Sequence, residues 1–312
     1  MTVDAGGLEM RVGALTPHGG AVVVGPPPDT RAPRLRPLVA RRPTVALALL
    51  VLALLALAAL LAPVLSPHAP NEPLDLLNLR LQPPSRAHPF GTDQFSRDLF
   101  SRVLHGARLS LGLGLFSVLV ATIAGTAVGA VAGYAGGPLD AVLMRTVDAL
   151  LAVPRVLLLL VVVSLWGTLE PPALVLLLGL TGWFGVARLV RAQVRAVRTR
   201  EYVLAARALG AGHARVLVRH VLPACAAPVI VAATLGIAHV IAIEAGLSYL
   251  GLGVTIPHAS WGTIIHDGTD YVQSAWWISV IPGLAIVLVM LCCTIVGDAL
   301  RDALDPRELS RR

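Results

Sequence analysis

Long apolar runs, separated by short polar segments, dominate the pattern of residues along the chain. Each run is about as long as the roughly 20 residues that a helix needs to cross the hydrocarbon core of a bilayer. Charged residues gather between the runs and are rare within them. The pattern therefore predicts an all-α membrane protein with six transmembrane helices. We place these helices at residues 44–66, 109–134, 140–166, 172–195, 224–250 and 276–299.

The first forty residues are rich in Gly and Pro and lack periodicity, which predicts a disordered tail. The first apolar run is too long, and too far from the N-terminus, for a typical signal peptide, so we interpret it as a membrane anchor. The expected regions are a cytoplasmic tail (1–40), the first helix (41–66), an external loop with an amphipathic helix (67–108), a five-helix core (109–306) with a cytoplasmic loop at 196–223, and a second cytoplasmic tail (307–312).

Composition supports a membrane protein, because 56% of the 312 residues are hydrophobic and 14% are charged. The mean hydropathy is +0.76. A soluble domain of this length has too little interior for so much apolar surface. The net charge of +7 comes from arginine, since the chain contains no lysine. These arginines flank apolar runs, so they favour anchoring at a membrane face over nucleic-acid binding. Three cysteines suggest no disulfide framework.

Arginine also predicts the orientation. Clusters precede the first span, fill the loop between the fourth and fifth, and follow the last. Six crossings place all three clusters, and both termini, on the side that the positive-inside rule assigns to the cytoplasm. The external segment 67–108 conflicts with this rule, because it also carries five arginines. These are Arg80, Arg86, Arg97, Arg102 and Arg108.

The polar stretch 201–223 contains a specific pattern of small residues and Pro. An Ala-Ala pair is followed four residues later by Gly210, and Leu-Pro comes twelve residues after this glycine. The spacing suits a short helix that ends at Gly210 and a new helix that begins at Pro223. The residues that carry the pattern are Glu201, Tyr202, Ala205, Ala206, Arg207, Gly210, Arg219, His220, Leu222 and Pro223.

This stretch resembles the cytoplasmic EAA loop of permease subunits in ABC importers, and most closely that of the dipeptide/oligopeptide (peptide/nickel) branch. The resemblance implies a type I importer permease fold, in which the loop forms a coupling helix that docks on an ATPase subunit. The family's usual Glu is Leu204 here, and Glu201 lies one turn earlier on the same helix face.

The resemblance also implies an assembly in a prokaryotic inner membrane. Its expected members are a second permease in a heterodimer, two ATPase subunits and an extracytoplasmic substrate-binding protein, within membrane lipid. ATP and Mg would belong to the ATPase subunits, and this chain would bind no cofactor. No P-loop lysine, nucleophile elbow or metalloprotease motif is present, so we expect a transport subunit and not an enzyme.

Two further motifs accompany the loop. Residues 91–102 resemble the family's Gly-Thr-Asp…Arg-Asp…Ser-Arg signature, although Ser96 stands where the family usually has Gly. We expect Thr92 to cap an amphipathic helix there, as a structural elbow or a substrate contact. A Gly repeat every four residues predicts close helix packing within the subunit or across a dimer seam. Its members are Gly125, Gly129 and Gly133.

Ionisable residues within predicted spans are candidates for function, because charge is costly in a bilayer. Arg145 and Asp148 are expected to pair on one helix face. Arg155 is expected to line the substrate path and meet a peptide carboxylate, or to pair with Glu244, the second candidate path residue. The histidines and aspartates before the last span match no metal-ligand spacing, so no metal site is predicted.

The peptide permease function has competitors. Nickel chelates and other small solutes are carried by relatives of the same branch. A self-sufficient channel or secondary transporter would instead show inverted repeats or broken helices near the midplane, and no repeat is evident. A membrane enzyme would need a convergent catalytic set, which the sequence does not supply.

Overall fold

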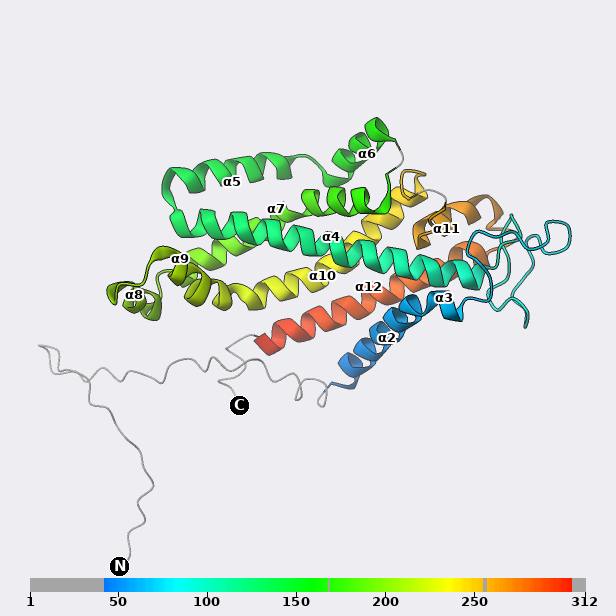
Figure 1. Cartoon of the computed structure of the whole chain (residues 1–312), viewed down its shortest axis with the longest axis horizontal. Helices are drawn as coiled ribbons and strands as arrows, with labels where there is room; N and C mark the ends of the chain where they lie inside the picture. Colours follow the sequence, from blue (N-terminus) through cyan, green and yellow to red (C-terminus); the bar gives the residue numbers. More distant parts are fainter. Residues whose placement is uncertain (1–41, 168, 255–256, 305–312) are drawn as a thin grey trace, which may run out of the picture. The chain divides into compact units, whose positions relative to one another are not determined.

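The computed structural model describes residues 42–167, 169–254 and 257–304. The tails predicted at 1–40 and 307–312 lie outside these described residues. Within them the chain is helical, with strand pairing limited to an isolated bridge between Thr92 and Asp98. The helices, seen in Figure 1, are α2 (Pro43–Leu60), α3 (Ala62–Leu65), α4 (Leu99–Ala135), α5 (Gly137–Ala152), α6 (Arg155–Trp166), α7 (Pro171–Val197), α8 (Glu201–Ala208), α9 (His213–Val216), α10 (Leu222–Tyr249), α11 (Trp261–Gly268) and α12 (Trp277–Leu304).

Five helical segments are long and apolar enough to cross a membrane. They are α2, α4, α7, α12 and the continuous run from α9 to α10. The pair α5 and α6, bent by 79° relative to each other, is together also long and apolar enough to cross. The six predicted spans are therefore matched when this pair crosses as one broken span.

The break between α5 and α6 has a local cause. Val153 is extended (ψ 124°), as expected for a residue before proline, and Pro154 precedes α6 as its N-cap. Proline also lacks the N–H that would continue the helical ladder. The sequence pattern predicts one helix at 140–166, although Arg145, Asp148 and Arg155 interrupt its apolar run, and it does not predict the break.

Helix α4 is longer than expected, because it begins at Leu99 and not at residue 109. Its 37 residues give a length of about 55 Å, which exceeds the roughly 30 Å hydrocarbon core. The Asp98 carboxylate caps it by accepting the Ser101 N–H at 2.9 Å. The predicted cap at Thr92 is therefore wrong, and Phe95 lies in the loop before the helix.

The glycine repeat on α4 packs against α7 of the same chain. A Cβ added at Gly125 would lie 2.7 Å from the Trp183 carbonyl oxygen, and one at Gly133 would lie 2.8 Å from that of Arg191. Gly129 faces Ala187 between them in the same way. Such distances are shorter than real Cβ contacts, so only glycine permits this approach. Of the two arrangements considered, the described helices show packing within the subunit.

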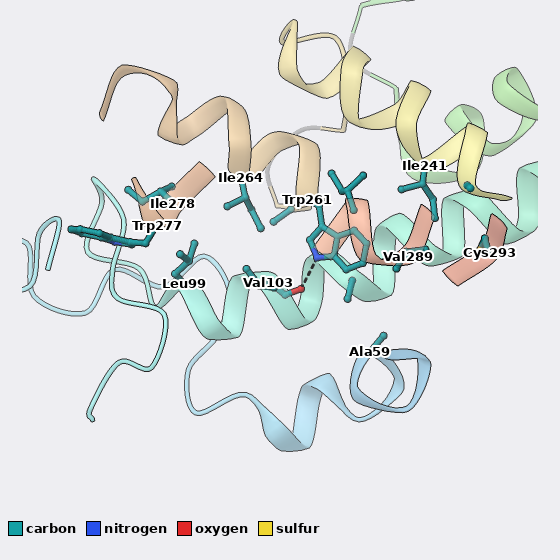
Figure 2. Packing of buried hydrophobic residues seen from close by; sticks show 14 of the residues in the cluster. Ala59, Leu99, Val103, Ile241, Trp261, Ile264, Trp277, Ile278, Val289 and Cys293 are labelled. Atoms are coloured by element: carbon teal, nitrogen blue, oxygen red, sulfur yellow. Dashed lines mark hydrogen bonds between the residues drawn. The ribbon is translucent and has the colours of Figure 1, made fainter. Parts of the chain in front are cut away.

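The first turns of α4 contact α10 and α11 and share a hydrophobic cluster with α12. Trp261 is the largest fully buried side chain in this cluster, and its indole N–H donates to the Val103 carbonyl at 3.1 Å (Figure 2). Leu99, Ile264 and Ile278 belong to the same cluster and have no exposed surface. The cluster fixes the short helix α11 to the ends of three spans.

Candidate functional site

The predicted coupling loop is built from two short helices joined by a turn. Helix α8 ends in a hydrogen-bond pattern in which the Gly210 N–H donates to Arg207 O (2.9 Å) and the Ala211 N–H donates to Ala206 O (3.1 Å). Such a terminus requires a left-handed residue, and Gly210 has φ +85°. The four-residue spacing from Ala206 to Gly210 is thus the spacing that ends this helix.

Helix α8 has one buried face and one exposed apolar face. Val203 is fully buried against the valines of α9 and the following turn. Tyr202, Leu204 and Leu209 are exposed by 40%, 49% and 89% respectively. Glu201 and Ala205 are exposed beside them. Exposed apolar side chains grouped on one helix are typical of a contact surface for a partner.

The chain continues from α9 through a π-helical turn, Leu217–Val221, into α10. Pro223 lies in the first turn of α10, as predicted, but the helical run is continuous from His213. A proline inside a helix lacks one N–H and collides with the carbonyl four residues earlier, which is the carbonyl of Arg219. A widened turn accommodates such a residue.

The remaining predicted coupling residues occupy different environments. Arg219 and Pro223 are exposed, while His220 and Leu222 are half-buried. Arg207 is half-buried because its guanidinium turns toward α4, where it lies 5.0 Å from the centre of the Tyr134 ring. Sequence reasoning missed Tyr134, which lies in the last turn of α4, because its contact with His213 spans 79 positions of the chain.

The signature at residues 91–102 forms a buried ionic network at the opposite end of α4. Asp93 accepts from Arg97 Nε (2.6 Å) and from Arg102 Nη1 (2.7 Å). Both arginines also bind Asp267 of α11, at 3.1 and 2.9 Å. Asp93 is fully buried and the two arginines nearly so. The network supports the structural interpretation of the motif, because its charges are directed at one another.

Arg155 begins α6 and points at α7. Its Nη2 donates to the Leu178 carbonyl (2.7 Å), and its Nε donates to the Thr181 hydroxyl (3.3 Å). The sequence also suggested an ion pair between Arg155 and Glu244, and this pair does not form in this conformation. Arg155 is half-buried and lies at the break between α5 and α6.

Glu244 of α10 is completely buried and contacts serines instead of a cation. Its carboxyl group accepts from Ser248 (2.7 Å) and from Ser110 of α4 (3.4 Å). Ser110 also accepts the Trp261 backbone N–H at 3.1 Å. The carboxyl group thus joins α4, α10 and α11, and in this conformation it has no surface for a substrate.

The predicted Arg145–Asp148 pair does not form. Asp148 instead lies 3.7 Å from Arg188 of α7, with both side chains exposed. Arg191, also on α7, binds Asp140 at 2.5 Å. These contacts join α5 to α7, because the two helices run side by side and offer partners that sequence spacing does not reveal.

Among the described residues no group of three or more His, Cys, Asp or Glu side chains has a metal-binding arrangement. An apolar groove of about 840 Å³ lies between the outer halves of α4 and α7. Phe116, Leu119 and Leu176 are among its apolar lining residues, and Arg108 and His258 are among its polar ones.

The comparisons with known proteins agree with this architecture. Residues 125–309 match the family described as binding-protein-dependent transport system inner membrane component. This match covers more than half of the chain. The chain belongs to this family. It is a multi-pass membrane permease component of an ABC-type transport system.

Curated relatives extend the similarity over most of this permease. It is 39% identical to the dipeptide transport system permease protein DppC of Bacillus subtilis, over 83% of this chain and 80% of that protein. It is 40% identical to the di/tripeptide transport system permease protein DppC of Pseudomonas aeruginosa, over 78% of this chain and 82% of that protein.

A solved structure supports the fold of the permease. The structure titled inward facing conformations of the MetNI methionine ABC transporter matches with a TM-score of 0.55. The match covers 66% of this chain and 98% of that chain, at 18% identity. The predicted type I importer permease fold is therefore confirmed, and at this identity the likeness concerns the fold alone.

Proposed function

We propose that this permease carries di- and oligopeptides inward, as one half of a heterodimeric path driven by two separate ATPase subunits. The observation that supports this best is the combination of peptide-permease relatives with an exposed apolar face on α8. ATP and Mg would bind to the ATPase subunits. An extracytoplasmic binding protein would deliver substrate at the α11 end, and both termini would lie in the cytoplasm.

The external arginines of residues 67–108 conflict less with an orientation that has both termini in the cytoplasm once their ion pairs are known. Arg97 and Arg102 are held in buried ion pairs with Asp93 and Asp267, so two of the five external arginines present little charge to solvent. The cytoplasmic loop, in contrast, leaves Arg200, Arg215 and Arg219 exposed.

We assign the two path candidates different parts in this proposal. Arg155 faces the path at the break of the third span and interacts with a substrate carboxylate. Glu244 acts indirectly by holding α10 against α4 and α11. Arg155→Gln should then weaken uptake of peptides with a free C-terminal carboxylate more than uptake of amidated peptides. Equal effects on both peptides would contradict this assignment.

The docking proposal is tested by enlarging side chains on α8. No other group lies within 4 Å of a Cβ built at Gly210, but its φ of +85° strains any side chain there, so Gly210→Arg needs a control for the backbone. We expect it to insert normally, to lose the ATPase in a pull-down, and to abolish uptake. Gly210→Asn is the matched control, because Asn tolerates the left-handed conformation. Ala205→Arg also places a bulky side chain on the docking surface of α8, but without backbone strain.

Competing functions predict different results. Uptake of nickel chelates in place of labelled peptides would favour another substrate of the same branch. The broken α5–α6 span is a feature that a self-sufficient transporter would share. Uptake by the purified permease in vesicles without any ATPase would support that function and contradict ours.

A further inference from the structure

The cytoplasmic end of α4 holds the coupling loop through a single aromatic side chain, Tyr134. The Arg207 guanidinium of α8 lies over its ring, 5.0 Å from the centroid. Its hydroxyl lies 3.2 Å from His213 Nδ1 in α9, and the two rings meet edge to face at 5.9 Å. Tyr134 therefore contacts both short helices, one on each side of the Gly210 turn.

The backbone around Tyr134 is held by another residue of the same loop. Arg198 Nη1 donates to the carbonyl oxygens of Gly133 and Tyr134, each at 3.0 Å. The last carbonyls of a helix lack partners within it, so this guanidinium completes the end of α4. The Tyr134 ring also packs on the cluster that buries Val203 and Val216. The end of α4 and the loop are thus joined by side-chain and backbone contacts.

A displacement of Tyr134 would be passed directly to the spans α4 and α7. Gly133, the preceding residue, is the last member of the glycine seam that presses α4 against α7. Because helix backbones in such a seam are in contact, α4 and α7 cannot slide past each other without breaking it. A push on Tyr134 therefore moves two spans together.

The outward face of α8 is separate from these contacts. Tyr202, Leu204 and Leu209 are exposed, whereas Arg207 is turned toward Tyr134. A change at Tyr134 thus leaves the exposed docking side chains in place. Binding of a partner and transmission of its movement are assigned to different residues.

We propose that Tyr134 is the positioning residue that transmits movement of the coupling loop to the α4–α7 pair. The proposal rests on the proposed function, in which an ATPase docks on α8. Removing the side chain should leave ATPase binding intact but reduce the amount of substrate moved per ATP hydrolysed. The hydroxyl contact and the ring contact each contribute to this transmission.

The test compares uptake and ATP hydrolysis by the full complex in proteoliposomes. Tyr134→Ala should retain the ATPase in a pull-down and lower substrate transported per ATP by roughly tenfold, because it loses both a cation–π contact and a hydrogen bond. Tyr134→Phe keeps the ring and should show a smaller loss. Tyr249→Ala is the matched control, because Tyr249 lies at the end of α10 that is far from the coupling loop. It should keep the wild-type amount of substrate transported per ATP.

A double-mutant cycle makes the test specific. If Tyr134 acts through Arg207, the losses in Tyr134→Ala and Arg207→Gln will not add in the double variant. If Tyr134→Ala fails to insert, the ratios of Tyr134→Phe and Arg207→Gln replace it. If both variants transport as much substrate per ATP as the wild type, the proposal is overturned. A lower amount of substrate per ATP would support it.

The failure of each proposal has its own signature. Absence of an ATPase from the wild-type pull-down would contradict the proposed function itself. An ATPase that binds wild type and Tyr134→Ala equally, with the same substrate per ATP in both, would leave the proposed function intact and overturn the role of Tyr134. Loss of ATPase binding in Tyr134→Ala would also overturn it, since docking would then depend on this residue.

Discussion

The two ends of α4 are built in different ways. The outer end is closed by buried ion pairs, the Glu244–serine contacts and the packing of Trp261. The other end, beside α8, leaves Leu204 and Leu209 exposed and holds its loop through Tyr134 and Arg198. Buried charges that satisfy one another make a frame with little freedom. Exposed apolar side chains are tolerated where a partner covers them. The outer end therefore fixes the spans, and under the proposed function the end beside α8 would receive the movement of an ATPase.

The largest effect should follow from breaking the outer network at Asp93. Asp93→Asn leaves Arg97 and Arg102 buried with only Asp267 as an acidic partner. Removing one partner of a buried ion pair typically costs about 3–5 kcal/mol. We expect a much lower midpoint of thermal unfolding in detergent. Glu72→Gln, on an exposed residue of the same loop, is the control. An unchanged midpoint in Asp93→Asn would show that this end is not held by its charges.

The seam between the two ends is tested by Gly129→Leu. The Cβ alone would collide with the Ala187 carbonyl, so α4 and α7 must separate. Overpacking of this kind costs about 1–3 kcal/mol or more. Gly112→Leu is the control on the same helix, because nothing lies within 4 Å of its Cβ. Similar unfolding midpoints for the two variants would contradict the tight α4–α7 contact.

Much of this architecture was predictable from local sequence. Apolar runs gave the number of spans, and the Ala206-to-Gly210 spacing gave the end of α8 because both are short-range properties. Long-range partners were not predictable. Asp267 lies 170 residues from Arg97, and Leu178 lies 23 residues from Arg155, so neither contact has a sequence spacing to identify it. The same limit explains why the glycine repeat on α4 did not reveal whether its partner belonged to the same chain.

The difference between the ends also predicts surface variants that affect binding and not stability. Leu204→Ser removes an exposed apolar side chain from α8, so its effect on unfolding should stay within about 0.5 kcal/mol. ATPase affinity should fall by roughly tenfold if the side chain enters a partner's groove, which corresponds to about 1.4 kcal/mol. Titration of the purified ATPase against both proteins measures this. Val218→Ser, also exposed but on the following turn, is the matched control.

The smallest predicted effect comes from the outer end and has the opposite sign. Ser96 has φ +57°, a left-handed conformation that favours glycine, and it is completely buried. Its hydroxyl group has no hydrogen-bond partner among the described residues. Ser96→Gly relieves the strain of the left-handed backbone and removes this buried hydroxyl, although the unfolded chain gains freedom. We expect a net stabilisation of about 1 kcal/mol, seen as a higher unfolding midpoint. Ser96→Ala removes the hydroxyl but keeps the strain, so it should gain less. A lower midpoint for Ser96→Gly would mean that the hydroxyl contributes a contact at the frame, and that the family's glycine at this position is not explained by backbone conformation.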